Sequence, residues 1–215
     1  MKIIKSDIDA AVKRDPAARN KLEVMLCYPG LRAIIWHRLS HFLYMHKFYL
    51  LARIISQLTR FWTGIEIHPG AKIGSGFFID HGMGVVIGET CEIGNNVTIY
   101  QGVTLGGTGK DIGKRHPTIG NDVLIGVGAK ILGPFKVGDG AKIGAGTIVL
   151  KEVPRNCTVV GNPGRIVRCC GQVMELPEES MDQIHIPDPI EQELKSIRER
   201  LLDVENKILR GEKNK

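Results

Sequence analysis

The sequence lacks several features that mark whole classes of proteins. Aromatic residues make up only 6% of its 215 residues, and no apolar run approaches the roughly 20 residues that cross a bilayer. Residues 1–9 alternate charged and apolar side chains, so no secretory signal peptide is expected. The five cysteines form no CxxC pair. These absences argue against a membrane protein and a CxxC metal site, and we expect reduced thiols and a cytoplasmic location.

Positive charge is not gathered into a patch for nucleic acid either. The net charge is +6, and residues 1–63 hold eleven Lys or Arg against four Asp or Glu. These basic residues are spread along apparent helices, so we expect neither nucleic acid nor a membrane as a partner. The excess of positive charge in this segment favours an anionic substrate.

Glycine, by contrast, is abundant and regularly spaced. An aliphatic residue recurs every six positions over residues 67–149, and Gly, Asn or Asp often stands three residues after it. A six-residue period fits short strands separated by corners, not an α-helix. Stacked aliphatic residues would then fill a parallel β-helix. They are Ile67, Ile73, Ile79, Ile87, Ile93, Ile99, Leu105, Ile119, Ile125, Ile131, Val137, Ile143 and Val149.

Both flanks of this repeat indicate helices. Apolar residues stand at helical spacing from about Ser6 onwards, with a break over residues 28–30. Residues 190–208 carry a heptad pattern typical of a three-stranded coiled coil, and docking of this helix onto the body is the alternative. The fold class is therefore mainly β with α. We expect an N-terminal helical domain over 1–63, a β-helix catalytic domain over 64–171, and a linker with a C-terminal helix over 172–215.

The repeat is broken where polar side chains gather. Asp80 and His81 stand where the register slips by two residues, and a glycine-rich, basic loop interrupts the pattern over residues 106–118. Arg115 and His116 lie in that loop. Departures from a scaffold's own pattern tend to mark function, so we expect at least one of the two histidines to take part in the chemistry.

Longer motifs make a family resemblance specific. The six-residue pattern resembles the hexapeptide-repeat family, in which three hexapeptides form one left-handed coil. The segments DHGMGVVIGET (80–90), GGTGK…RHP (106–117) and GNPGRIV (161–167) are similar to those of bacterial serine O-acetyltransferases, and residues 13–17 resemble that family's RDPA motif. The resemblance implies transfer of acetyl from acetyl-CoA to the hydroxyl of L-serine, for cysteine biosynthesis, without a metal.

The resemblance also implies roles for individual residues. His81 would be the general base, and Glu66 would orient its ring at a position where the family commonly has Asp. The serine-binding residues would be Asp15, Asp80, Arg115 and His116. The coenzyme-binding residues would be Gly107, Thr108, Lys142, Gly144, Ala145 and Gly146.

Partners and alternative functions complete these expectations. The family implies a homotrimer or a hexamer, and inhibition by L-cysteine. A complex with cysteine synthase is not expected, because the chain ends in Lys215 instead of an aliphatic anchor. The nearest alternative is an acetyltransferase of this fold with a sugar or another hydroxyl or amine acceptor. A remote one is a zinc hydratase of the carbonic-anhydrase type, with His68, His81 and His116 as ligands.

Overall fold

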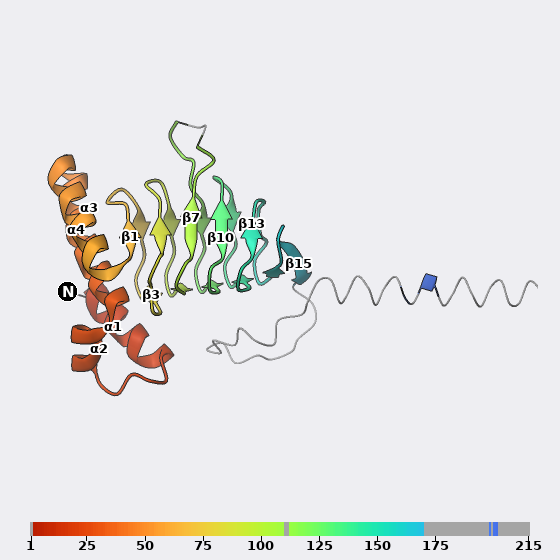
Figure 1. Ribbon diagram of the computed structural model, residues 1–215, viewed down its shortest axis with the longest axis horizontal. Coiled ribbons are helices and arrows are strands. Elements are labelled where there is room, and N and C mark those ends of the chain that lie inside the picture. Colours follow the sequence, from red (N-terminus) through yellow and green to blue (C-terminus); the bar gives the residue numbers. More distant parts are fainter. Residues whose placement is uncertain (1, 110–111, 170–197, 199, 202–215) are drawn as a thin grey trace, which may run out of the picture.

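The computed structural model describes residues 2–109 and 112–169, together with residues 198, 200 and 201. Within these residues, helices form a cap at one end of a stack of short strands (Figure 1). The helices are α1 (Lys2–Arg14), α2 (Lys21–Cys27), α3 (Pro29–Met45) and α4 (Tyr49–Thr63).

The helical region departs from the sequence-based prediction in two details. The predicted break is present, since Tyr28 separates α2 from α3 and Pro29 occupies the first position of α3. However, α1 begins at Lys2 and not near Ser6. A second break, over residues 15–20, was not predicted; it contains Pro16, which cannot continue a helix.

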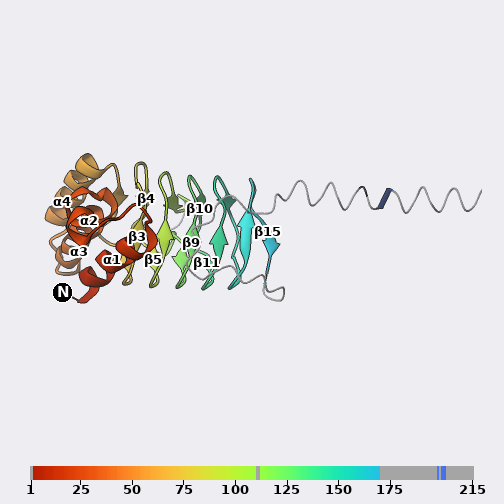
Figure 2. The same ribbon diagram turned by 90° about the horizontal axis from the view of Figure 1, so that it is seen from below.

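The strands form three sheets, parallel except for β15, that make up the sides of the β-helix (Figures 1 and 2). The first sheet has the order β1-β4-β7-β10-β13, the second β2-β5-β8-β11, and the third β3-β6-β9-β12-β14-β15. Successive strands enter successive sheets, so three strands make one coil. The strands are β1 (Glu66–Ile67), β2 (Lys72–Ile73), β3 (Phe78–Ile79), β4 (Val86–Ile87), β5 (Glu92–Ile93), β6 (Thr98–Ile99), β7 (Thr104–Gly106), β8 (Thr118–Ile119), β9 (Leu124–Ile125), β10 (Lys130–Leu132), β11 (Lys136–Val137), β12 (Lys142–Ile143), β13 (Ile148–Val149), β14 (Thr158–Val160) and β15 (Arg165–Arg168).

The repeat fills the interior of the β-helix as predicted. Of the thirteen aliphatic residues of the pattern, all but Ile73 are buried, and Ile73 is partly buried against the same core. The corners also behave as their residue types indicate. Asn96 and Asp122 have φ values of +58° and +56°, a left-handed conformation that Asn and Asp tolerate better than most residues. The local pattern therefore specifies both the core and the corners.

The β-helix ends in a short hairpin formed by its last two strands. Strand β14 still stacks in parallel on β12, with Thr158 opposite Lys142. Strand β15 then turns back and pairs antiparallel with β14. This hairpin brings Cys157 and Cys169 together as a disulfide, with their Cα atoms 4.2 Å apart. The expectation of reduced thiols is therefore wrong for this pair.

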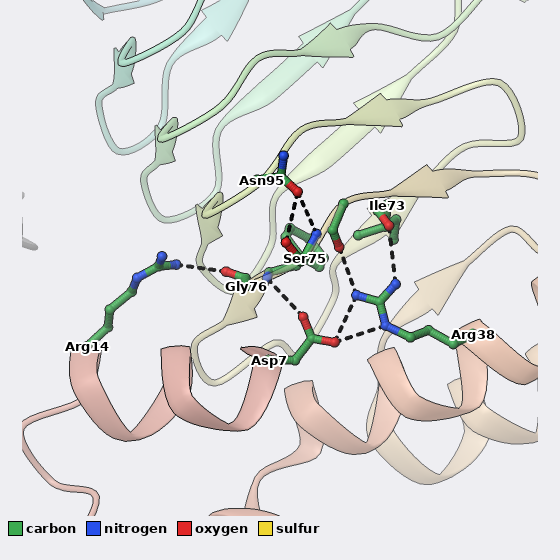
Figure 3. A network of polar contacts seen from close by, with 9 residues as sticks. Asp7, Arg14, Arg38, Ile73, Ser75, Gly76 and Asn95 are labelled. Atoms are coloured by element: carbon green, nitrogen blue, oxygen red, sulfur yellow. Dashed lines mark hydrogen bonds and ion pairs between the residues drawn. The ribbon is translucent and has the colours of Figure 1, made fainter. Parts of the chain in front are cut away.

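Three charged residues join the helical cap to the first coils; we call Asp7, Arg14 and Arg38 the helix clamp (Figure 3). Asp7 is fully buried and lies 2.8 Å from Nη2 of Arg38. It also accepts a hydrogen bond from Phe77 N at 3.2 Å. The Arg38 guanidinium donates onward to the carbonyls of residues 73 and 74 at 3.2 and 2.8 Å. Each polar group of the joint thereby has a partner, as a buried charge requires.

The predicted C-terminal coiled coil lies outside the described residues. Only residues 198, 200 and 201 of that segment are described, and they are helical, so the coiled coil stays a prediction. Among the described helices, none combines the length and apolar character needed to cross a membrane.

Candidate active site

His81 lies at the corner that joins β3 to β4, where the repeat register slips. Its backbone is left-handed, with φ of +56°, and its side chain is 74% exposed. Asp80 beside it is mostly buried, with Oδ1 4.0 Å from Nε2 of His81. The corner is tied to the first strand, because Glu66 N donates to Val85 O at 2.9 Å. An accessible imidazole is therefore held on a rigid element beside a carboxylate.

Glu66 does not contact His81 in this single chain. Its Oε2 lies 3.2 Å from Nη1 of Arg60, on α4. Of the two carboxylates near this corner, Asp80 is the one in ion-pair range of the imidazole. The predicted orienting role of Glu66 remains a prediction.

Asp15 directly follows Arg14, the last residue of α1. Its Oδ1 accepts a hydrogen bond from Ala17 N at 2.8 Å, and its Oδ2 accepts one from the Tyr28 hydroxyl. Burial, and then the negative charge of Asp15, raise the pKa of Asp80, while His81 acts in the opposite direction. Two carboxylates whose charges act on each other attract a cation such as an ammonium group. The joint role of Asp15 and Asp80 in binding the serine ammonium stays a prediction from the resemblance.

Tyr28 was missed by the sequence-based reasoning. Burial and the hydrogen bond to Asp15 raise the pKa of its hydroxyl, so this group remains a donor at physiological pH. The tyrosine stands in the YPG break between α2 and α3. A break in a helix predicts a turn, but it does not predict which distant side chain the turn contacts.

Arg115 and His116 come from the loop after β7, which projects from the β-helix (Figure 1). Arg115 donates to Oε2 of Glu89 at 2.6 Å, and the Tyr44 hydroxyl donates to the other oxygen of Glu89 at 3.0 Å. The His116 ring is almost buried, with Nδ1 2.9 Å from Oγ1 of Thr90. Burial, and then Arg115, lower the pKa of His116. Glu89 and Thr90 belong to the quoted 80–90 motif, which is the signal that could have singled them out.

The proposed site residues fall at two different corners of the triangular coil. The His81 corner, residues 80–85, joins the third sheet to the first. The His116 corner, residues 88–91 together with 107–109 and 112–117, joins the first sheet to the second. The two corners lie at opposite ends of strand β4 (Val86–Ile87), and the printed side-chain contacts of Arg115 and His116 go to Glu89 and Thr90 instead of His81. One chain therefore does not bring His81 and Arg115 together.

The predicted coenzyme residues divide in the same way. Gly107 and Thr108 belong to the His116 corner, whereas residues 144–146 follow β12 in the same column as the His81 corner. Lys142 lies on β12, opposite Thr158. Three backbone hydrogen bonds, each one coil further along, connect the His81 corner to residue 146. They are Gly102 N to Met83 O at 2.9 Å, Gly128 N to Gln101 O at 2.9 Å, and Gly146 N to Val127 O at 2.7 Å.

This column provides an open surface for an extended ligand. Three coils at about 4.8 Å each cover roughly 14 Å. A Cβ added at Gly128 or Gly146 would meet no atom within 4 Å, so the backbone is accessible there. A long, narrow ligand can lie along these corners against the main chain.

A zinc site receives no support from the side-chain geometry. Among residues 2–109 and 112–169, no group of three His, Cys, Asp or Glu side chains could hold a metal ion. His68 accepts a hydrogen bond from Gly70 N at 3.0 Å on Nδ1, which gives it a structural role in its turn. His81 and His116 stand at different corners.

A β-helix built from six-residue repeats, with an exposed histidine at a corner, is typical of acyltransferases of the hexapeptide class. The family model "Bacterial transferase hexapeptide (six repeats)" matches residues 116–151. The model "Hexapeptide repeat of succinyl-transferase" matches residues 82–106.

Individual relatives narrow this class. The chain is 58% identical over 207 residues to the serine acetyltransferase of Bacillus subtilis (strain 168), covering 96% of this chain and 94% of the relative. It is similar to a solved serine acetyltransferase in complex with cysteine, with a TM-score of 0.81 and 43% identity over 86% of this chain and 71% of the other. A Brucella abortus serine acetyltransferase in complex with coenzyme A has a TM-score of 0.76 and 47% identity, over 77% and 66%.

The chain therefore belongs to the serine acetyltransferase family. It transfers the acetyl group of acetyl-CoA to the hydroxyl of serine, on the route to cysteine. The six-residue repeat alone is compatible with a sugar or another acceptor. The similarity to serine acetyltransferases identifies serine as the acceptor.

Proposed function

We propose that His81 is the general base of this acetyl transfer. The supporting observation is its exposed imidazole at the register slip, 4.0 Å from the Asp80 carboxylate. A hydroxyl is a weak nucleophile near neutral pH and needs a base within hydrogen-bond reach. His81 takes the hydroxyl proton as the serine oxygen bonds to the thioester carbonyl carbon. The carbon–sulfur bond then breaks, and the proton passes from His81 to the sulfur of coenzyme A.

Glu66 is proposed to orient the other nitrogen of the His81 ring. Its strand is bonded to the His81 corner through Glu66 N and Val85 O. Its carboxylate would have to leave Arg60, and this exposed ion pair is worth at most about 1 kcal/mol. Because Glu66 orients the base and does not carry the proton, its loss should cost less turnover than the loss of His81.

The active site is proposed to form between two chains of a homotrimer. One chain supplies His81, with Asp15 and Asp80 for the serine ammonium. The neighbouring chain supplies Arg115 and His116 for the serine carboxylate, where a guanidinium offers two parallel donors. The supporting observation is that these groups lie at opposite corners of one sheet.

Coenzyme A is proposed to lie along the groove between the same two chains. The backbone of Gly144, Ala145 and Gly146 would line one side and that of Gly107 and Thr108 the other, with Lys142 near a phosphate. The open glycine column supports this placement, and a relative binds coenzyme A.

Cysteine, further assembly and location belong to the same proposal. L-cysteine should compete with serine, since a relative was solved in complex with cysteine, and excess serine should relieve the inhibition.

Two trimers are proposed to pair through the helical cap, where Leu50, Phe61 and Trp62 are 77%, 84% and 63% exposed. A cytoplasmic location is proposed as well: the free thiols of Cys27 and Cys91 favour it, whereas the Cys157–Cys169 disulfide does not.

Mixed oligomers test the site between chains. His81→Asn and Arg115→Met chains should each be inactive alone. After the two are unfolded together and refolded, about one site in four should combine an intact His81 with an intact Arg115. The matched control mixes His81→Asn with Asp80→Asn, whose defects lie on the same chain of each site. No recovery of activity in the first mixture, or equal recovery of activity in both mixtures, would contradict an active site formed between two chains.

A further inference from the structure

Asp15 lies outside the β-helix, so its approach to Asp80 depends on how α1 docks. The residue before it, Arg14, contacts two coils, and Figure 3 shows the contact with Gly76 on the first of them. Its Nη1 donates to Gly76 O at 3.1 Å on the first coil and to Thr98 Oγ1 at 3.0 Å on the second. The end of α1 is thereby fixed to the β-helix one residue before the carboxylate.

The Asp15 carboxylate is itself held at both oxygens. Ala17 N donates to Oδ1 and the Tyr28 hydroxyl donates to Oδ2. Tyr28 is in turn packed against a small core formed by Ala11, Val24, Leu31 and Phe78. The donor to Oδ2 therefore comes from a side chain that the helical cap keeps in place.

This restraint has a physical purpose in a site with two like charges. Burial and, to a smaller extent, the negative charge of Asp15 raise the pKa of Asp80, so the two carboxylates repel each other when no cation lies between them. A free aspartate side chain would rotate away from such a neighbour. A donor on Oδ2 and an anchor one residue earlier hold Asp15 in place before the cation arrives.

We propose that Tyr28 and Arg14 are positioning residues that set the affinity for the amino group of the acceptor. Tyr28 orients the Asp15 carboxylate towards Asp80, and Arg14 fixes the end of α1 that carries it. This inference rests on the proposed role of Asp15 and Asp80 in binding the serine ammonium.

Tyr28→Phe is the sharpest test, because it removes one hydroxyl and keeps the packed ring. The full-length enzyme is assayed for the KM of serine, the KM of acetyl-CoA and kcat. It is also assayed for the inhibition constant of 3-hydroxypropanoate, which keeps the carboxylate and hydroxyl of serine but lacks the ammonium. Loss of a hydrogen bond to a charged group should raise the KM of serine about tenfold. The KM of acetyl-CoA and the inhibition constant should not change. Tyr49→Phe, on an exposed tyrosine of α4, is the matched control.

Arg14→Met provides a second test of the proposal, and Lys13→Met on the same helix is its control. Arg14→Met should raise the KM of serine more than Lys13→Met does, again without changing the inhibition constant of 3-hydroxypropanoate. A rise shared equally by serine and 3-hydroxypropanoate would show a general distortion and overturn the inference.

Asp15→Asn separates this inference from the proposed function beneath it. If Asp15→Asn leaves the KM of serine unchanged, the proposed ammonium site is wrong. If Asp15→Asn raises this KM and Tyr28→Phe does not, the ammonium site stands and the positioning role is refuted.

Discussion

Removal of the Asp7 side chain should destabilise the protein far more than a typical surface substitution. Asp7→Ala leaves the Arg38 guanidinium, which is only 17% exposed, without its counterion. It also leaves Phe77 N without an acceptor. Breaking a buried pair from one side costs about 3–5 kcal/mol. Arg38 keeps its two carbonyl acceptors, so we expect the lower end, about 3 kcal/mol.

Two further variants identify the origin of this loss. Asp7→Asn keeps an oxygen for Phe77 N and should cost less, because burial already disfavours the carboxylate and raises the pKa of Asp7 against the effect of Arg38. Arg38→Met should make the loss of Asp7 less harmful, since the unpaired charge is gone. We expect a coupling of about 1–3 kcal/mol between the two positions.

Guanidinium unfolding at one fixed protein concentration measures these differences, because assembly contributes to apparent stability. Tryptophan fluorescence suits the assay, since both tryptophans lie in the helical cap, at Trp36 and Trp62. A loss below about 1 kcal/mol for Asp7→Ala, or strictly additive effects of Asp7→Ala and Arg38→Met, would refute the role of the pair in holding the cap.

Three other outcomes are expected. His81→Asn should lower kcat by a factor of about 100 or more without moving the thermal midpoint, and near-normal turnover in a folded variant would exclude His81 as the base. The KM of serine should rise as the pH falls, because protonation removes the charge of Asp80. Since the pKa of Asp80 is raised, that rise should begin above the pH at which an ordinary aspartate titrates, and Asp80→Asn should flatten the profile. Truncation after residue 187 should lower the thermal midpoint of the assembly, and an unchanged midpoint would contradict the predicted coiled coil.

Much of the fold was predictable because its signals are local. An aliphatic residue every sixth position and Gly, Asn or Asp at the corners specify the coil one segment at a time. Departures from that pattern led to His81 and to the loop with Arg115 and His116. The motifs around them then led to the family and its reaction.

Contacts between distant segments were decided only by the tertiary structure. Tyr28 contacts Asp15 because the chain turns twice between α1 and α3, and Arg14 reaches Thr98 across 84 residues of sequence. The β14–β15 hairpin that joins Cys157 to Cys169 was likewise not predicted. The placement of the site residues at two corners depends on which sheet each strand enters, a property of the whole stack. Residue types and spacing therefore determined the coil and its exposed histidine. The packing of the helices decided which side chain holds the Asp15 carboxylate, because such contacts arise only once separate elements pack together.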